Sequence, residues 1–115
     1  MEPLIIKQKH EDLIQYAYKC LGQFPKSERH VLAADIRKGL YEIDGLIIRA
    51  QKKYFKKTTL QDLDIEVEAL KTKIRLAYKL EFIPIKKYEN LVKMLLEIGR
   101  MVGGWIKRFD SRSPS

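Results

Sequence analysis

The chain has 115 residues, with 45% hydrophobic and 33% charged side chains, which suits one globular domain and argues against a disordered chain. Its 23 Lys and Arg residues outnumber 15 Asp and Glu residues, so the net charge is +8. This charge favours a polyanionic partner, first nucleic acid, then an acidic protein surface or an anionic membrane, although a merely soluble basic protein is the alternative.

The lengths of the apolar runs and the number of cysteines bear on where the protein is expected in the cell. The patch Leu4–Ile6 is too short for the apolar part of a signal peptide, and no apolar run approaches the ~20 residues of a membrane span. The single cysteine, Cys20, excludes an internal disulfide and is expected to be a small buried core residue. We therefore expect a cytoplasmic protein without a membrane partner.

The first predicted helix covers about residues 4–21. Its apolar side recurs at spacings of three and four residues, which is typical of a helix with one buried face. His10 lies on this face, but no second ligand stands at helical spacing, so we expect a partly buried or interface histidine and not a metal ligand. The predicted buried face comprises Ile6, His10, Leu13, Ile14, Ala17 and Leu21.

The second predicted helix covers about residues 27–56, after Pro25. Ser27 or Lys26 would begin it, because a hydroxyl side chain and a following acid suit a helix N-terminus. Gly39 and Gly45 lie in its interior, where they either mark a close helix approach or are simply tolerated. The predicted buried face comprises Leu32, Ile36, Leu40, Ile43, Ile47, Ala50 and Tyr54.

The third and fourth predicted helices cover about residues 60–82 and 85–109. Thr59 and Asp62 resemble a capping box before the third helix, and its acids Asp64, Glu66 and Glu68 are expected to face water. Pro84 suits the first turn of the fourth helix. The predicted buried faces comprise Leu60, Leu63, Val67, Leu70, Ile74 and Ala77, and Tyr88, Leu91, Leu95, Ile98, Val102, Trp105 and Phe109.

Four long helical segments with short links predict an all-α fold, an antiparallel up-down-up-down four-helix bundle over residues 1–109, with a flexible tail over residues 110–115. Apolar residues also lie off the predicted buried faces, which favours self-association; a wider core without an oligomer is the alternative. These residues are Tyr41, Ile48, Phe55, Ile65, Leu76, Leu80, Ile83, Leu96, Met101 and Ile106.

The sequence contains no arrangement of residues typical of an enzyme. Its two histidines form no H-E-x-x-H or Glu-x-x-His pair, and no phosphate loop, nucleophile elbow or CxxC motif occurs. We therefore expect no catalytic residue, no metal and no cofactor. A small enzyme with a metal in the bundle core remains as a hypothesis from a different class.

Basic clusters are the functional signal that remains once these motifs are absent. In an up-down-up-down bundle the end of the second helix and the end of the fourth share one pole, where basic side chains could contact phosphates without reading sequence. This pole would gather Lys52, Lys53, Lys56, Lys57, Lys107 and Arg108. Lys73, Arg75, Lys79 and Arg100 complete the predicted nucleic-acid or partner-binding set. The alternative is that lysines near helix C-termini only complement helix dipoles.

Two stretches carry a family resemblance: residues 24–29 (Phe-Pro-Lys-Ser-Glu-Arg) and residues 97–107 (Glu-Ile-Gly-Arg-Met-Val-Gly-Gly-Trp-Ile-Lys), with residues 86–89 (Lys-Lys-Tyr-Glu) between them. Together they resemble the accessory variability determinant (Avd) proteins of diversity-generating retroelements. That family is part of a four-helix superfamily that includes proteins encoded in 23S rRNA intervening sequences, and such a protein of unknown role is the alternative. The resemblance covers about residues 4–108.

The resemblance implies a homopentamer of four-helix protomers that binds a retroelement reverse transcriptase and nucleic acid. It would support mutagenic copying of a template repeat into a variable repeat, with template-repeat or spacer RNA, and possibly DNA, as the nucleic acid. Within the most specific stretch, Gly99 and Gly103 share a helix face and Trp105 is a large anchor nearby. We expect this packing motif to serve either the core of one protomer or a contact between subunits.

Overall fold

The computed structural model describes residues 2–112, and the chain in this range is helical apart from short connections. Its elements are α1 (Glu2–Leu21), the short 3-10 helix η1 (Lys26–Glu28), α2 (Leu32–Lys52), α3 (Lys57–Lys79) and α4 (Ile85–Arg112). None of the described residues forms a strand, so the predicted all-α class is confirmed. The tail expected over residues 110–115 stays a prediction: α4 includes its first three residues, and residues 113–115 lie outside the described range.

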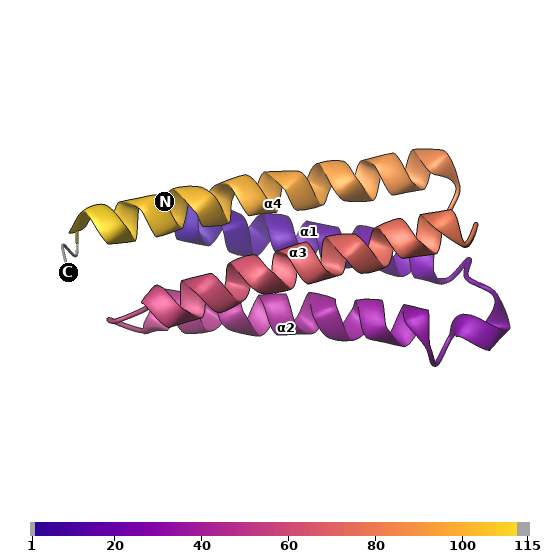
Figure 1. Ribbon diagram of the computed structural model, residues 1–115, viewed down its shortest axis with the longest axis horizontal. Coiled ribbons are helices and arrows are strands. Elements are labelled where there is room, and N and C mark those ends of the chain that lie inside the picture. Colours follow the sequence, from indigo (N-terminus) through magenta and orange to yellow (C-terminus); the bar gives the residue numbers. More distant parts are fainter. Residues whose placement is uncertain (1, 113–115) are drawn as a thin grey trace.

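The four long helices lie side by side and alternate in direction along a molecule of 49 × 24 × 20 Å (Figure 1). α1 packs against α2 and α4, and α3 packs against the same two helices, so each helix contacts its two neighbours around a shared core. This arrangement is the predicted four-helix bundle. One pole holds the α2–α3 connection and the end of α4, and the other holds the α1–α2 and α3–α4 connections (Figure 1).

The core consists of the side chains that recur every three or four residues along the helices, as predicted. Cys20 is buried, and Ile14, Tyr88 and Phe109 pack against the core while half-buried. Ile83, expected outside the core, is only 3% exposed, and Met101 and Ile106 are half-buried. Seven of the off-face apolar residues are exposed: Tyr41, Ile48, Phe55, Ile65, Leu76, Leu80 and Leu96.

The α1–α2 connection begins the second helix five residues later than predicted. Pro25, with its fixed φ of −55°, leads into η1, and Val31 then leaves the helical region at φ −118° and ψ −100°. Buried Phe24 packs at 5.5 Å from the ring of Phe82 in the α3–α4 connection. The chain therefore turns here to bring two connections together at this pole, which residue-by-residue helix preference does not reveal.

Less of the chain near the α2–α3 connection is helical than predicted. α2 ends at Lys52, because Lys53 is extended at φ −82° and ψ 142°, and α3 begins at Lys57. Tyr54 is therefore not on the buried face, and its side chain is 84% exposed. The predicted capping box is wrong as well: Lys56 occupies the N-cap without a side-chain hydrogen bond, and Thr59 is buried within the first turn of α3.

The α3–α4 connection ends α3 at Lys79, three residues before the predicted end. Glu81 adopts a left-handed conformation with φ 67°, and its amide donates to the Tyr78 carbonyl while the Phe82 amide donates to the Ala77 carbonyl, both at 2.9 Å. This pair of hydrogen bonds is a Schellman motif, which satisfies carbonyls at the end of a helix. The turn then places Ile83 in the core and lets Pro84 lead into α4.

Candidate nucleic-acid interface

The pole with the α2–α3 connection brings predicted binding residues from different helices together. The Lys56 ammonium lies 5.5 Å from the centre of the Trp105 ring on α4, a cation–π contact. Lys57 lies beside Ile106 and Phe109, also on α4. The exposed Lys107 and Arg108 belong to the same last turns of α4. We call the set Lys52, Lys53, Lys56, Lys57, Lys107 and Arg108 the basic pole.

The basic pole is held in place by contacts to the bundle. Lys53 donates a hydrogen bond of 3.3 Å from its Nζ to Oγ1 of Thr59, which closes the turn between α2 and α3. Lys56 is held against Trp105, itself only 6% exposed. Lys52, Lys53 and Lys57 are exposed, and no ion pair within the described part of the chain involves any of the four lysines between residues 52 and 57. Their positive charge is thus presented to solvent.

Two aromatic side chains stand in the middle of the basic pole. Tyr54 and Phe55 are 84% and 76% exposed, and their rings pack edge to face with centroids 4.8 Å apart. Helical spacing had placed Tyr54 in the core and Phe55 among residues for self-association. The signal that could have placed them here is the run of residues 52–57, in which lysines flank the aromatic pair on both sides.

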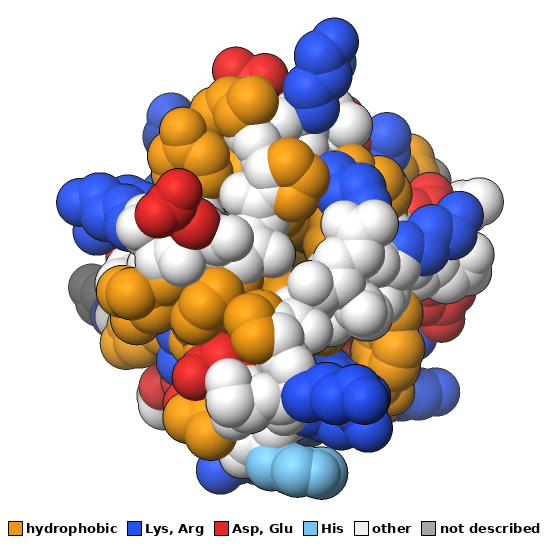
Figure 2. Space-filling view, turned by 90° about the vertical axis from the view of Figure 1, so that its right-hand side faces the viewer, with side chains coloured by type: hydrophobic (Ala, Val, Ile, Leu, Met, Phe, Trp, Pro, Cys, Tyr) orange, Lys and Arg blue, Asp and Glu red, His pale blue; other side chains and the backbone are white. Residues whose placement is uncertain are grey.

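The remaining basic residues of the predicted set do not join this pole. Lys73, Arg75 and Lys79 are spread along α3, and Lys79 lies beside Pro84 near the opposite pole. Arg100 lies on α4 next to Leu96 and Lys93. At the opposite pole, acidic side chains are interspersed with Lys, Arg and hydrophobic ones (Figure 2). The structure therefore divides the predicted set into a clustered part and a dispersed part.

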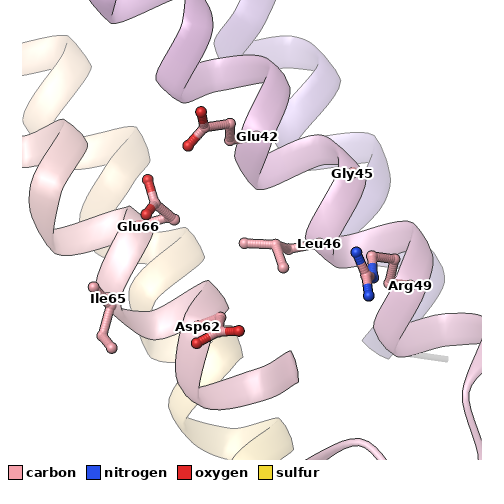
Figure 3. A pocket seen from close by; sticks show the side chains of 7 residues that line it. All are labelled: Glu42, Gly45, Leu46, Arg49, Asp62, Ile65 and Glu66. Carbon is pink, nitrogen blue, oxygen red and sulfur yellow. The ribbon is translucent and has the colours of Figure 1, made fainter. Parts of the chain in front are cut away.

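Between α2 and α3 lies an open groove of about 370 Å³ with an acidic character. Glu42 on α2 and Glu66 on α3 reach into the same space, with Asp62, Arg49 and the apolar Leu46 further along it (Figure 3). Partial burial, followed by the charge of Glu42 and a hydrogen bond with it, raises the pKa of Glu66. Glu66 is half-buried at the edge of this open groove, whereas Asp64 and Glu68 are exposed, as expected.

His10 is fully buried between α1 and α2, deeper than the partly buried or interface position expected from the sequence. Its Nε2–H donates a hydrogen bond of 2.8 Å to the Leu40 carbonyl, and its Nδ1 has no partner in the described structure. Burial, the largest cause, lowers the pKa of His10. Across residues whose side chains are described, no three of His, Cys, Asp and Glu lie together as a metal site would require. Burial also raises the pKa of the Cys20 thiol.

The packing motif behaves differently at its two glycines. A methyl group added at Gly99 would lie 3.8 Å from Cγ1 of Val67, an ordinary contact, and one added at Gly103 would have no neighbour within 4 Å. Neither glycine is thus required for close helix packing within this protomer, and a role between subunits stays a prediction. The close approach occurs at Gly39, where an added methyl would lie 3.3 Å from Cδ1 of Leu70.

Comparison with known proteins adds a family assignment. A family model described as bAvd-like matches residues 4–109, which is nearly the entire bundle. A search of curated proteins found no match. None of the helices over the described residues has the length and apolar character needed to cross a membrane.

Proposed function

The chain belongs to the bAvd-like family of Avd-type accessory proteins, and from that premise we propose that it binds a retroelement reverse transcriptase and nucleic acid. In this role the partner enzyme performs template-to-variable-repeat copying, and this non-catalytic chain holds the RNA or DNA backbone. The observation that carries the nucleic-acid part is the basic pole, where six basic residues from α4 and the α2–α3 region gather at one end.

The charge of the basic pole suits phosphate contacts that do not depend on base sequence. Each neutralised phosphate releases counterions, so binding weakens as salt rises, with a slope of about 0.7 per phosphate contact for a single strand. Lys52 and Lys57 are the residues to change, because both are exposed and neither anchors the connection as Lys53 and Lys56 do. Lys73, Arg75, Lys79 and Arg100 are proposed as dispersed secondary contacts.

We also propose that the protein assembles as a homopentamer in the cytoplasm. Exposed apolar side chains on the outer helix faces support self-association, among them Ile65 at 61%, Leu80 at 49% and Leu96 at 49%. Light scattering at micromolar concentration measures the assembly directly. A monomer under those conditions would contradict the pentamer and leave the nucleic-acid role to be tested separately.

The central experiment measures RNA binding by the full chain across a salt series. We expect Lys52→Gln/Lys57→Gln to weaken binding and to lower the salt slope by about 1.4, as two lost phosphate contacts require. Lys19→Gln/Lys26→Gln, two exposed changes at the opposite pole, is the matched control and should leave the slope unchanged. Absence of binding by the wild type at low salt would refute the nucleic-acid role.

The reverse transcriptase part has its own test. Co-expression with the reverse transcriptase from the same genomic neighbourhood should yield a complex that survives purification. A reverse transcriptase gene flanked by template and variable repeats supports this role, whereas a location inside a 23S rRNA gene supports the alternative of an intervening-sequence protein.

A further inference from the structure

The most exposed apolar surface of the described residues is the aromatic pair at the basic pole. Tyr54 and Phe55 are 84% and 76% exposed, more than any other large hydrophobic side chain in the described part of the chain, where Ile65 follows at 61%. The edge-to-face packing of the two rings covers little of them, so ring faces remain open to solvent. These two rings bury little apolar area, so they add little to the stability of the fold, and their exposure points to a role outside folding.

The surroundings of the aromatic pair are fixed and positively charged. Lys53 is anchored to Thr59 and Lys56 to Trp105, so the connection is attached to the bundle on both sides of the rings. Lys52 and Lys57 remain exposed immediately outside these anchors. The rings are therefore presented on a supported turn with a cation on each side.

Aromatic faces beside cations match one ligand chemistry in particular. Unpaired bases stack on aromatic side chains while basic side chains track the phosphate backbone, and this recognition tolerates any sequence. A duplex offers the phosphates but keeps its base faces stacked inside. Protein interfaces also bury aromatic side chains, but an acidic protein surface offers no row of phosphates with flat base faces beside it, so charge and aromaticity together favour a single strand.

We propose that Tyr54 and Phe55 form a stacking platform for unpaired bases, so that this pole prefers single-stranded nucleic acid over duplex. The inference rests on the proposed nucleic-acid role and adds the strandedness of the ligand. Lys52 and Lys57 supply affinity that single and double strands share, and the aromatic pair supplies the difference between them.

The test compares two probes that carry the same labelled strand. One is an unstructured RNA of about 16 nucleotides, the upper end of the usual site size for a single-strand binding fold, and the other is its duplex with the complementary strand. Binding to the full-length protein is followed by fluorescence anisotropy over a salt series. Wild type should bind the single strand more tightly than the duplex.

Three variants separate stacking from apolar contact. Tyr54→Leu/Phe55→Leu retains apolar volume but removes the ring faces, and should weaken single-strand binding about tenfold, within the range for losing one stacked base, with under about twofold effect on duplex. Tyr54→Phe/Phe55→Tyr retains both rings and should bind as the wild type does. Tyr41→Leu, at an aromatic residue 55% exposed on α2, is the matched control and should change neither affinity.

The salt dependence separates the two contributions. The leucine variant should keep the wild-type salt slope, since no phosphate contact is lost, whereas Lys52→Gln/Lys57→Gln should lower the slope and keep the preference for the single strand. An unchanged affinity in the leucine variant, or equal loss for both probes, would overturn the proposal. A third result would also overturn the proposal. If the leucine variant lost binding to anionic phospholipid vesicles but kept its single-strand binding, the rings would be assigned to a membrane surface.

Failure of the inference differs from failure of the proposed function. Equal, salt-sensitive binding of both probes by the wild type would leave the nucleic-acid role standing and remove the stacking platform. Binding of neither probe would remove both. All substitutions are at exposed positions, so circular dichroism should show an intact bundle in each variant.

Discussion

The His10 imidazole on α1 donates a hydrogen bond of 2.8 Å to the Leu40 carbonyl on α2, in a site where the ring is fully buried. The neighbouring charges are the Lys7, Glu11 and Asp44 side chains, with Lys7 paired to Glu11 at 2.7 Å and to Asp44 at 2.9 Å. The other ring nitrogen, Nδ1, has no partner among the described groups. A second proton on this ring would therefore be buried without a hydrogen-bond acceptor, which is costly.

The first prediction concerns the pH dependence of folding through His10. Its folded pKa is below the ordinary value near 6.5, so its contribution is complete above about pH 6.5 and is lost as pH falls toward the folded pKa. In urea unfolding experiments, stability should therefore decrease as pH falls below about 6.5. His10→Gln, which retains an N–H donor, should remove this part of the dependence. His30→Gln, at an exposed histidine, should retain it.

The second prediction concerns the Glu42–Glu66 pair in the groove. The pKa of Glu66 is raised by partial burial and by Glu42, so its charged form is disfavoured in the folded state and stability decreases as pH rises through the folded pKa. Glu66→Gln should therefore stabilise at neutral pH, by no more than about 0.5 kcal/mol at a solvent-accessible site. The gain should vanish below about pH 4, where the carboxyl is protonated in both states. Glu68→Gln is the exposed control, and an equal gain there would contradict the assignment to the groove.

The third prediction contrasts two helical glycines. Gly103→Ala should stabilise the protomer by up to about 1 kcal/mol, because alanine favours the helix and the added methyl meets open space. The Gly39→Ala variant should be at least about 1 kcal/mol less stable than the Gly103→Ala variant, because the same helix gain is opposed by a 3.3 Å contact with buried Leu70. Chemical unfolding measures both. If Gly103 lies between subunits, its variant should unfold at higher denaturant as a protomer yet assemble less well in sedimentation experiments.

The fourth prediction concerns the turn that ends α3. Glu81 has φ 67°, a conformation that costs a non-glycine residue about 1 kcal/mol. Glu81→Gly should relieve this strain and raise stability by about 0.5 kcal/mol once the greater freedom of glycine in the unfolded chain is included. Glu81→Ala should give no such gain, since it keeps the strained Cβ. A thermal unfolding comparison of the two variants measures the difference.

The helical faces show why much of the fold could be predicted. Leu13, Leu63 and Leu95 each belong to an apolar face that repeats at the helical period of its own helix. Each is fully buried, because a helix that faces one core must bury one side. The boundaries were predicted less well. Pro25 and the lysine-rich residues 52–57 are visible as irregularities, but the connections also contain contacts between residues far apart in sequence, such as Phe24 with Phe82 and Lys56 with Trp105, which the sequence does not reveal.

The sequence by itself determined the helical class, the buried faces and the excess of positive charge, because these follow from periodicity and composition along the chain. Tertiary structure decided what meets across helices: Glu66 with Glu42, His10 with the Leu40 carbonyl, and Gly39 against Leu70. The tertiary structure also leaves Tyr54 exposed, although it was expected in the core, and Tyr54 lies with Phe55 among the lysines of the basic pole. The reason is that helical period assigns a residue to a face only while the helix continues, and α2 ends two residues before Tyr54.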